Sequence, residues 1–499
     1  MKVRQLAEET LDPQDWEAFR ALAHQMVDRM LDAQRTVRER PTWQPVPEEV
    51  EVRFREDRPM QGAGPEAAYA DFLELVLPYP TGNDHPRFWG WAGGTGSPMG
   101  MMAEMLAAGM NSVAGIFNDG AARVERQVVD WMKAALGMPA AASGVFTSGG
   151  SVANLIALAV GRDARAGYDV TELGVGAEAG KLVFYASAET HSSMLKSAKL
   201  LGLGQDAVRI VPIDDRLRMD LPALSRMIVS DREDGLRPFG VVGTAGTINT
   251  GSIDDLDGIA DIAAREGLWF HVDGAFGAMA ALSPETRGLV SGLERADSLA
   301  FDFHKWMYVP YEAGCVMIRN ATDHLTSFSV KAAYLDPLPR GTGAQPESTN
   351  FRSPQLSRGF KALKVWMMLK EHGFEKFGRL VDQNVQQARY LGGLVEAEPQ
   401  LELMAPVALN VVAFRFAPPD LLRLDVGPDA NSTVLDDVNK ELLMRIQERG
   451  IAVPSATKVR DRFTMRVCIC NHRSRREDFD LLVGEVVRIG QEIMEECDD

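Results

Sequence analysis

The sequence predicts an α/β protein built on a mainly parallel sheet, because short β-rich runs alternate with amphipathic helices through its middle. The clearest strands are expected at 182–185, 208–211, 239–242, 268–272 and 298–301. The helices that accompany them are expected at 151–162, 191–201, 220–230 and 254–266. Strands separated by helical crossovers favour parallel pairing, since each helix returns the chain to the same starting edge.

Helical segments precede this region. Residues 13–38 carry apolar side chains at helical spacing, a Pro-rich stretch follows, and a second helix is expected near 66–77. Neither helix can bury its apolar face alone. We therefore expect residues 1–97 to form a helical arm that packs on another subunit or on its own chain.

The chain after the predicted sheet continues with further elements. Residues 313–319 are expected to form one more strand, as an antiparallel neighbour, and a long helix is expected to begin near 358–372. The remainder contains helices and strands such as 411–416 and is typical of a small α+β domain. The expected domains are thus 1–97, a large domain at 98–372 and a small domain at 373–499.

Composition excludes several classes of function. The chain has 499 residues, of which 45% are hydrophobic and 25% charged, and a formal net charge of −17. That negative charge argues against nucleic acid or an anionic membrane as partner. Four cysteines are too few for a disulfide framework, and a metal site at Cys468 and Cys470 is not expected. With no leader and no apolar run of roughly 20 residues, we expect a cytoplasmic protein.

A glycine-rich turn opens the predicted helix at 151–162. Its sequence, from Thr147 to Asn154, reads Thr-Ser-Gly-Gly-Ser-Val-Ala-Asn. Gly150 permits close backbone approach, and the helix N-terminus attracts an anion such as phosphate. Ser151 could add a hydroxyl donor. The same pattern also fits an ordinary turn in which Ser151 caps the helix, and it is not a P-loop.

Polar residues follow the next two strands. His191 comes after the strand at 182–185, where an imidazole can stack on a flat heteroaromatic ring; it can equally be incidental to a capping loop. Thr244 and Thr247 follow the strand at 239–242, so their hydroxyls could reach a ligand at the same edge. Small polar residues are also ordinary turn formers.

Asp273 ends an otherwise apolar strand. A buried carboxylate needs a partner, because burying it alone costs several kcal/mol. A protonated pyridine nitrogen would be such a partner, and the contact would make the ring an electron sink. A helix cap or a structural salt bridge is the alternative. Gly274 and Ala275 are small enough for a ring to lie against the backbone.

Lys305 follows the apolar run that ends at Phe303 and His304. In an apolar site the pKa of a lysine falls, which favours the neutral amine that attacks an aldehyde. A surface lysine at a strand end is the alternative interpretation. The anion loop, His191, Asp273 and Lys305 each fall just past a predicted strand, and ligands collect at that edge of such sheets. Together they are the minimum apparatus for pyridoxal phosphate chemistry.

These motifs resemble the group II pyridoxal-phosphate-dependent decarboxylases. The resemblance runs from His85-Pro-Arg-Phe-Trp89 to Phe360-Lys-Ala-Leu-Lys-Val-Trp366, and more loosely to the C-terminus. Its most specific part is His304-Lys305-Trp306 with His-Val-Asp273 upstream. It implies the aspartate-aminotransferase-like type I fold of PLP-dependent transferases, in a homodimer with shared active sites. It also implies decarboxylation of an L-amino acid to an amine and CO₂.

The resemblance assigns roles residue by residue. Lys305 would form the covalent link to pyridoxal 5′-phosphate, Asp273 would bind the pyridine nitrogen and His191 would stack on the ring. The remaining cofactor-binding residues would be Gly150, Ser151 and His304 at the phosphate, with Thr247 and Ala275 along the cofactor. Tyr334 matches a mobile-loop tyrosine that reaches the partner's active site and protonates the carbanion left by CO₂. Arg352 matches an arginine near that loop.

The substrate is the most open part of the interpretation. Trp91-Ala92-Gly93 replaces the Tyr-Phe-Pro of aromatic-substrate members, and 119–125 departs from the family's Pro-x-x-Thr-Glu-Leu-Glu. Phe88, Trp89 and Trp91 favour an aromatic amino acid, unless they only pack the N-terminal arm. An acidic amino-acid decarboxylase, an aldehyde synthase, a carbon–carbon lyase and a non-enzymatic binding protein are the alternatives. Tyr334 argues against aldehyde synthesis, and the presence of Lys305 and Asp273 argues against loss of activity.

Overall fold

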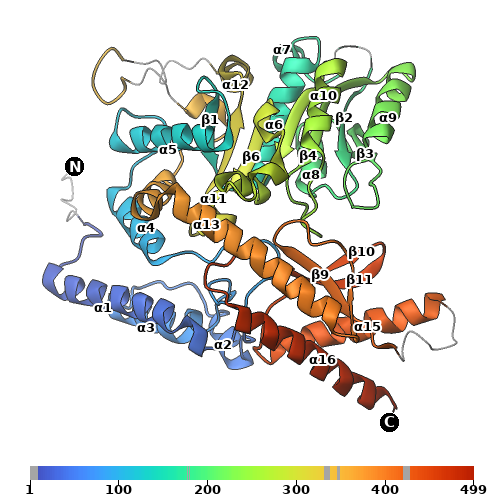
Figure 1. Cartoon of the computed structure of the whole chain (residues 1–499). Coiled ribbons are helices and arrows are strands. Elements are labelled where there is room, and N and C mark those ends of the chain that lie inside the picture. The colour runs from blue at the N-terminus through green and yellow to red at the C-terminus, as the bar shows by residue number, and fades with distance from the viewer. Residues whose placement is uncertain are drawn as a thin grey trace.

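The N-terminal segment is helical and lies beside the small domain (Figure 1). The computed structural model describes the chain except residues 1–8, 177, 179, 331–337, 345–348, 420–427 and 499. Helix α1 spans Trp16–Arg35, α2 spans Glu48–Arg53 and α3 spans Pro65–Asp71, continued by a π-helical turn at Phe72–Val76. Asp15 caps α1 by accepting hydrogen bonds from the Glu17 and Ala18 N–H groups.

A seven-stranded sheet forms the centre of the large domain. Its spatial order is β1-β7-β6-β5-β4-β2-β3. Neighbours from β3 to β6 pair in parallel, whereas β7 is antiparallel to both β6 and β1, so the mainly parallel sheet and its antiparallel neighbour are confirmed. The strands are β1 (Ser143–Thr147), β2 (Leu182–Ser187), β3 (Val208–Val211), β4 (Arg237–Thr244), β5 (Trp269–Asp273), β6 (Ser298–Asp302) and β7 (Gly314–Ile318).

Helices cover both faces of this sheet, which is why its strands are apolar on both sides. In β6, Ala300 packs in a cluster with α6, while Leu299 and Phe301 belong to the cluster that contains α5 and α10. The helices of this domain are α4 (Pro98–Met110), α5 (Gly120–Leu136), α6 (Gly150–Arg165), α7 (Val170–Leu173), α8 (Ser193–Leu200), α9 (Leu221–Glu233), α10 (Leu256–Glu266), α11 (Phe303–Trp306) and α12 (Ala321–Phe328).

The C-terminal region carries a separate four-stranded antiparallel sheet, in the order β10-β11-β9-β8. Its strands are β8 (Leu401–Leu403), β9 (Val411–Phe416), β10 (Ser455–Val459) and β11 (Arg462–Cys468), packed with α15 (Pro428–Glu448) and α16 (Arg476–Asp498). The long helix α13 (Ala362–Ala397) runs from the large domain to this sheet (Figure 1). It breaks at Gly373, where the backbone has φ 71°, beside the boundary expected at 372/373.

Strand β1 is the main element that periodicity missed. It is five residues long and fully buried, and it immediately precedes the glycine-rich turn. A five-residue strand that is buried on both faces and has only two large apolar side chains, Val145 and Phe146, gives no alternation to detect. Because β1 runs in the same direction as β6, its end delivers the glycine turn to the edge where the other polar residues meet.

Candidate active site

A cavity of about 370 Å³ lies at the carboxyl ends of β1, β4, β5 and β6. Nearly all the residues singled out from the sequence meet there. Its lining residues include Ser148, Gly149, Gly150, Ser151, Asn154, His191, Thr244, Asp273, Ala275, Phe276, Asp302, His304, Lys305, Tyr311 and Glu312. The structure therefore brings together segments that are more than 160 residues apart in the sequence, from Ser148 to Glu312.

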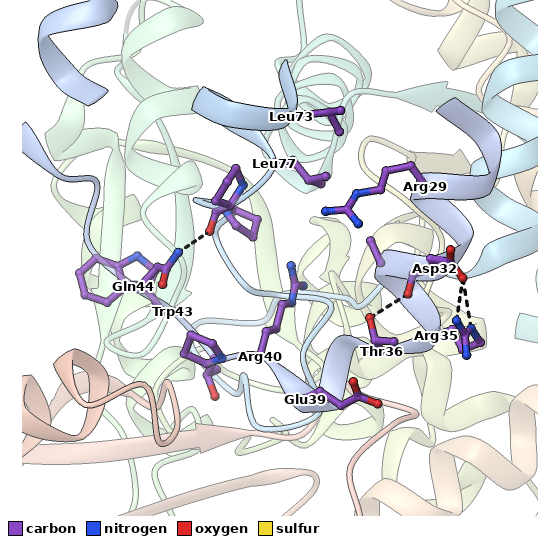
Figure 2. A pocket seen from close by; sticks show the side chains of 15 residues that line it. Arg29, Asp32, Arg35, Thr36, Glu39, Arg40, Trp43, Gln44, Leu73 and Leu77 are labelled. Carbon is purple, nitrogen blue, oxygen red and sulfur yellow. Dashed lines mark hydrogen bonds and ion pairs between the residues drawn. The ribbon is translucent and has the colours of Figure 1, made fainter. Parts of the chain in front are cut away.

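A larger cavity, of about 570 Å³, lies among α1, residues 36–44 and residues 73–80 (Figure 2). Several of its polar groups are already engaged with one another. Arg35 pairs with Asp32 at 2.8 Å, and Gln44 Nε2 donates to the Pro78 carbonyl at 2.9 Å. None of the sequence-predicted site residues within the described part of the chain lines this cavity. Chemistry rather than size therefore identifies the site.

The glycine turn places the start of α6 against the cavity. Gly149 is the N-cap residue and no side chain caps the helix, so the interpretation of Ser151 as the cap is wrong. Ser151 instead lies exposed in the first turn. A Cβ at Gly150 would lie 3.0 Å from Asp302 Oδ2 and 3.4 Å from Ala275 Cβ, so glycine permits this close packing. The uncapped N-terminus of a 16-residue helix favours an anion here.

Asp273 is held rigidly at the end of β5. Its Oδ1 accepts a hydrogen bond from the Ala275 N–H at 3.1 Å, and its Oδ2 accepts one from Asn154 Nδ2 at 3.0 Å. Asn154 Oδ1 in turn contacts His271 Nε2 at 2.9 Å. Burial lowers the pKa of His271 to about 4, so this imidazole is neutral and orients Asn154. Among the described residues Asp273 has no ion-pair partner, and the neighbouring helix is capped at Phe276 instead.

His191 is tied to the same network. The Ser193 N–H donates to His191 Nδ1 at 3.2 Å, and Ser193 Oγ lies 2.9 Å from that nitrogen and 3.0 Å from Asn154 Nδ2. Because Nδ1 accepts a backbone hydrogen bond, the ring is fixed in orientation. Desolvation lowers the pKa of His191, and the Lys305 ammonium lowers it further against the opposing effect of Asp273. A neutral, oriented imidazole therefore faces the cavity at neutral pH.

Lys305 lies on the short helix α11, one turn after Asp302. Its Nζ pairs with Asp302 Oδ2 at 3.1 Å. Burial lowers the pKa of Lys305, but the carboxylates of Asp302 and Asp273 outweigh it, and the net pKa is raised. The expectation of a lowered pKa is therefore wrong, because two carboxylates share the apolar site with the amine. His304 is fixed by the residue that precedes β7, since the Ala313 N–H donates to His304 Nδ1 at 3.1 Å.

Two sequence-predicted residues lie elsewhere, and a third is not among the described residues. Thr247 is buried with its Oγ1 3.1 Å from Thr250 Oγ1, and the cavity wall from this loop is made by Thr244, Gly246 and Ile248. Arg352 lines a different cavity, next to α5. Tyr334 lies outside the described residues.

Sequence reasoning assigned no role to Asn154, Asp302, Tyr311 or Glu312. Asp302 had a signal, because a carboxylate three residues before a lysine faces it across one helical turn. Asn154 had a weaker one, as an amide one turn into the helix that follows the glycine loop. Tyr311 and Glu312 gave no periodic or motif signal.

The cavity fits pyridoxal phosphate. Two buried oxygens on its wall, Thr244 Oγ1 and Asp302 Oδ1, have no hydrogen-bond partner among the described residues. A carboxylate, an amine and an uncapped helix N-terminus surround a space bounded by the small Ala275 and the flat His191 ring. These are the groups required for a pyridine nitrogen, an aldehyde, a phosphate and an aromatic ring, respectively.

Comparison with known proteins gives the family. The model described as the pyridoxal-dependent decarboxylase conserved domain matches residues 47–417. Aromatic-L-amino-acid decarboxylase of Bacillus atrophaeus is 32% identical over 482 residues, covering 96% of this chain and 96% of that protein. Cysteine sulfinic acid decarboxylase of Mus musculus is 31% identical over 430 residues, covering 84% and 85%.

A solved structure agrees over the whole fold. The crystal structure of Oryza sativa TDC with PLP and tryptamine matches with a TM-score of 0.88 and 25% identity, covering 97% of this chain and 100% of that one. The type I fold expected from the resemblance is confirmed. No helix in the described part of the chain is long and apolar enough to cross a membrane. With its family domain spanning most of its length, this chain belongs to the pyridoxal-dependent decarboxylases, which use pyridoxal 5′-phosphate to remove CO₂ from amino acids.

Proposed function

We propose that the substrate is an aromatic L-amino acid, which the enzyme converts to the corresponding amine and CO₂. The observation that carries this proposal is the charge of the cavity. Among its described lining residues Lys305 is the single lysine or arginine. The two lysines that line the neighbouring cavity, Lys361 and Lys364, are already paired with carboxylates, so they favour an acidic side chain less. Phe276, Ile248 and Tyr311 add apolar and aromatic surface.

Trp89 and Phe88 favour an aromatic substrate less than the cavity does, because both side chains are engaged in packing. Trp89 is 1% exposed, stacks on Phe479 at a centroid distance of 5.0 Å and donates from Nε1 to Ser474 Oγ at 3.0 Å. Phe88 is also buried, and neither residue lines the cavity. These two side chains therefore serve to pack the fold and do not contact the substrate cavity. The relatives include enzymes named for aromatic and for sulfinic substrates, so the charge of the cavity is the better guide.

The site residues divide the chemistry as follows. When bound, pyridoxal phosphate supplies the electron sink for cleavage of the bond between Cα and the carboxylate. Lys305 would hold the cofactor covalently through its Nζ. Asp273 keeps a proton on the pyridine nitrogen, and His191 stacks on the ring. Gly150, Ser151 and His304 would hold the phosphate, and Ala275 would lie along the cofactor.

The proposal includes Tyr334 as the acid that protonates Cα after CO₂ leaves. Its support is the resemblance of the segment around it to the family's loop. A phenol on such a loop can donate a proton, whereas a phenyl ring cannot. In Tyr334→Phe the carbanion should instead be oxidised by dissolved O₂, which is reduced to hydrogen peroxide, and hydrolysis with water should release aldehyde and ammonia in place of amine. An unchanged yield of amine without peroxide would contradict this role.

We propose further that the enzyme is a cytoplasmic homodimer. Three apolar side chains of α4 support the dimer, because Met105, Leu106 and Met110 are 48%, 46% and 56% exposed. Free thiols at the buried Cys315, Cys468 and Cys470 support a reducing compartment. Light scattering tests the dimer, and a fully active monomer would refute it.

The substrate proposal is tested with a panel of natural L-amino acids assayed for CO₂ and for amine. Tyrosine, phenylalanine, tryptophan or their hydroxylated relatives should have the highest kcat/KM. A preference for glutamate, aspartate or cysteine sulfinate would overturn the aromatic substrate but leave the decarboxylase standing. Borohydride reduction followed by peptide mapping should place the cofactor on Lys305, and a label on another lysine would refute that assignment.

A further inference from the structure

A second cavity adjoins the cofactor cavity. It has a volume of about 400 Å³, and both volumes fall in the range of roughly 300–1,000 Å³ that is usual for small-molecule sites. Tyr311 and Glu312 line both cavities. These two residues therefore form the boundary between the cofactor's space and the second cavity, whose other wall comes from α4 and the start of α13.

Two ion pairs line the second cavity, and in each pair the carboxylate side chain is more exposed than the lysine. Glu312 pairs with Lys361 at 3.2 Å, and Glu104 pairs with Lys364. The carboxylate side chains are 50% and 46% exposed, whereas the lysines are 19% and 2% exposed. The ammonium groups thus lie beneath the surface and the carboxylate oxygens face outward. Such a lining offers hydrogen-bond acceptors to a ligand rather than donors.

Tyr311 is fixed at the lysine end of the cofactor cavity. Its ring lies over the His304 ring at a centroid distance of 4.4 Å, and a Cβ at Gly93 would lie 3.6 Å from its Oη. The positive charge of Lys305 lowers the pKa of the phenol, against the larger effect of burial, so the two groups lie within electrostatic reach. Tyr311 is nonetheless 51% exposed, and a ligand can contact the ring.

The direction of a substrate side chain follows from these positions. In the proposed reaction the substrate's amino nitrogen takes the place of Lys305 Nζ, and Cα lies one bond away. The strand ends on the sheet side are buried, as Asp273 is at 3% and Thr244 at 4%. The half-exposed edge at Tyr311 and Glu312 is one open route out of the cofactor cavity, and it is the one that leads into the second cavity.

We propose that the side chain of the substrate passes Tyr311 into the adjoining cavity, where Glu312 accepts a hydrogen bond from its far end. The preferred amino acid is then one whose ring carries an O–H or N–H group, such as a phenol, rather than a bare phenyl ring. This inference rests on the proposed function and narrows it. Tyr311 and Glu312 act as specificity-determining residues, and Tyr311 supplies the aromatic surface along which the ring lies.

The experiment compares L-tyrosine with L-phenylalanine in the holoenzyme and in a graded series at Glu312. The wild type should favour tyrosine in kcat/KM. Glu312→Gln keeps a neutral acceptor and should reduce the tyrosine-to-phenylalanine ratio about threefold, while Glu312→Ala removes the acceptor and should reduce it about tenfold. The loss should fall on the tyrosine values, with phenylalanine unchanged. Tyr311→Leu should instead lower both substrates together and leave the ratio intact.

Glu402→Ala is the matched control. Glu402 is a carboxylate, 39% exposed, that pairs with the buried Arg415 at 2.6 Å in the small domain, so its loss also strands a cation. The ratio should not change in this variant. An unaltered ratio in Glu312→Ala, or a wild type that prefers phenylalanine, would overturn the proposal.

A binding measurement separates this inference from the proposed function. Calorimetric titration of the holoenzyme with tyramine and with phenethylamine should show tighter binding of tyramine, and the difference should disappear in Glu312→Ala. If no amino acid releases CO₂, the proposed function fails, yet this titration still tests the second cavity. Equal affinities for the two amines in the wild type would refute the hydrogen bond to Glu312.

Discussion

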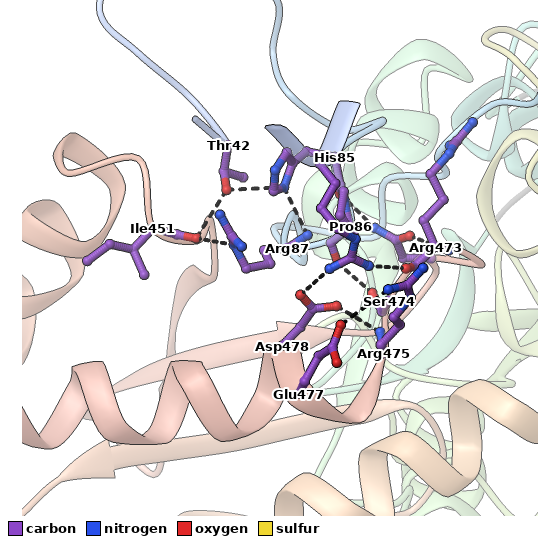
Figure 3. A network of polar contacts seen from close by, with 12 residues as sticks. Thr42, His85, Pro86, Arg87, Ile451, Arg473, Ser474, Arg475, Glu477 and Asp478 are labelled. Carbon is purple, nitrogen blue, oxygen red and sulfur yellow. Dashed lines mark hydrogen bonds and ion pairs between the residues drawn. The ribbon is translucent and has the colours of Figure 1, made fainter. Parts of the chain in front are cut away.

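Two regions of the molecule bury many polar groups, but they differ in whether those groups have hydrogen-bond partners. One is the joint between residues 85–89 and the loop that leads into α16 (Figure 3). There Asn471 Nδ2 donates to the His85 carbonyl at 2.8 Å, and Ser474 Oγ donates to the Pro86 carbonyl at 2.6 Å. The other is the cofactor cavity, where Thr244 Oγ1 and Asp302 Oδ1 are buried without a partner among the described residues.

The difference separates a structural joint from a site. A buried polar group that has a hydrogen-bond partner holds two segments together. A buried polar group without one costs about 1–3 kcal/mol, and a ligand that pairs with it removes this cost. The joint has one exception, because His85 Nε2 also lacks a partner. Burial lowers the pKa of His85 to about 3, so the imidazole stays neutral. The cost of its unpaired Nε2 is therefore small beside that of a buried charge.

The largest effect is expected from the cavity carboxylate. Asp273→Asn preserves the shape at the end of β5 but cannot hold a proton on the pyridine nitrogen. Turnover should fall by about 10²–10³-fold with little change in KM, because the lost interaction matters most in the transition state. Steady-state kinetics checks this, and circular dichroism should show an unchanged fold. Near-normal turnover would mean that Asp273 is not the partner of the ring nitrogen.

Low pH should reduce the free energy of unfolding, because both regions contain buried imidazoles that are neutral in the folded state. The pKa values of His85 and His472 in the joint are lowered to about 3 and about 4, and that of His271 behind the cavity to about 4. The unfolded chain binds these protons near pH 6.5, so stability is full above that pH and falls as the pH drops towards 4 and 3. Each buried imidazole should cost about 3 kcal/mol at pH 4.

Denaturant titrations between pH 7 and pH 4 test this dependence. His85→Asn retains a polar group beside Thr42 and Arg87 but does not titrate, so its stability should decline less steeply than that of the wild type. His24→Asn, at an exposed position on α1, is the control and should follow the wild-type slope. Equal slopes for all three proteins would show that His85 is not protonated on unfolding.

Removal of a hydrogen-bonding side chain from the joint should lower the stability of the fold and leave cofactor binding unchanged. Ser474→Ala removes the acceptor of the Trp89 indole N–H and the donor to the Pro86 carbonyl, and both groups stay buried. The free energy of unfolding should fall by about 1–3 kcal/mol. The absorption of the bound cofactor should not change. Ser291→Ala, which removes a hydroxyl that donates to Asp257 at the surface, should cost less than about 0.5 kcal/mol.

The two regions also differ in how far the sequence predicts them. His191, Asp273 and Lys305 were found because each follows an apolar strand, and topology brings strand ends to one edge. The anion loop was found from its glycines at the start of a predicted helix. The joint gave no such signal, since Trp89 and Ser474 lie 385 residues apart and contact only in the fold. Tyr311 and Glu312 were missed for the same reason. Their significance depends on two cavities that meet beside them, and no periodicity reports a cavity.

The raised pKa of Lys305 shows another limit. Its apolar strand predicted a lowered pKa, and burial does act in that direction. The opposing carboxylates were both visible in the sequence, but their distances from Nζ were not. Whether burial or charge prevails depends on geometry at the scale of 3 Å, such as the 3.1 Å that separates Lys305 Nζ from Asp302 Oδ2.

The smallest expected effect sharpens this point. Asp302→Asn removes one of the two carboxylates that hold the proton of Lys305, so the pKa of the lysine should fall by about one unit. The neutral amine attacks the cofactor aldehyde, and the ammonium cannot. The rate at which the apoprotein turns yellow with added pyridoxal phosphate should therefore rise about tenfold near neutral pH. Its pH profile should move by about one unit towards acid.

Asp297→Asn is the matched control for this rate. Asp297 precedes the start of β6, as Asp302 ends it, and its Oδ2 accepts a hydrogen bond from the Phe270 N–H at 2.9 Å, at the opposite edge of the sheet from Lys305. Its loss removes the same formal charge without touching the cavity, so the pH profile should stay in place. If Asp302→Asn also leaves the profile unmoved, then Asp273 alone holds the proton of Lys305. Asp302 would then serve only to position the glycine turn, against which its Oδ2 packs.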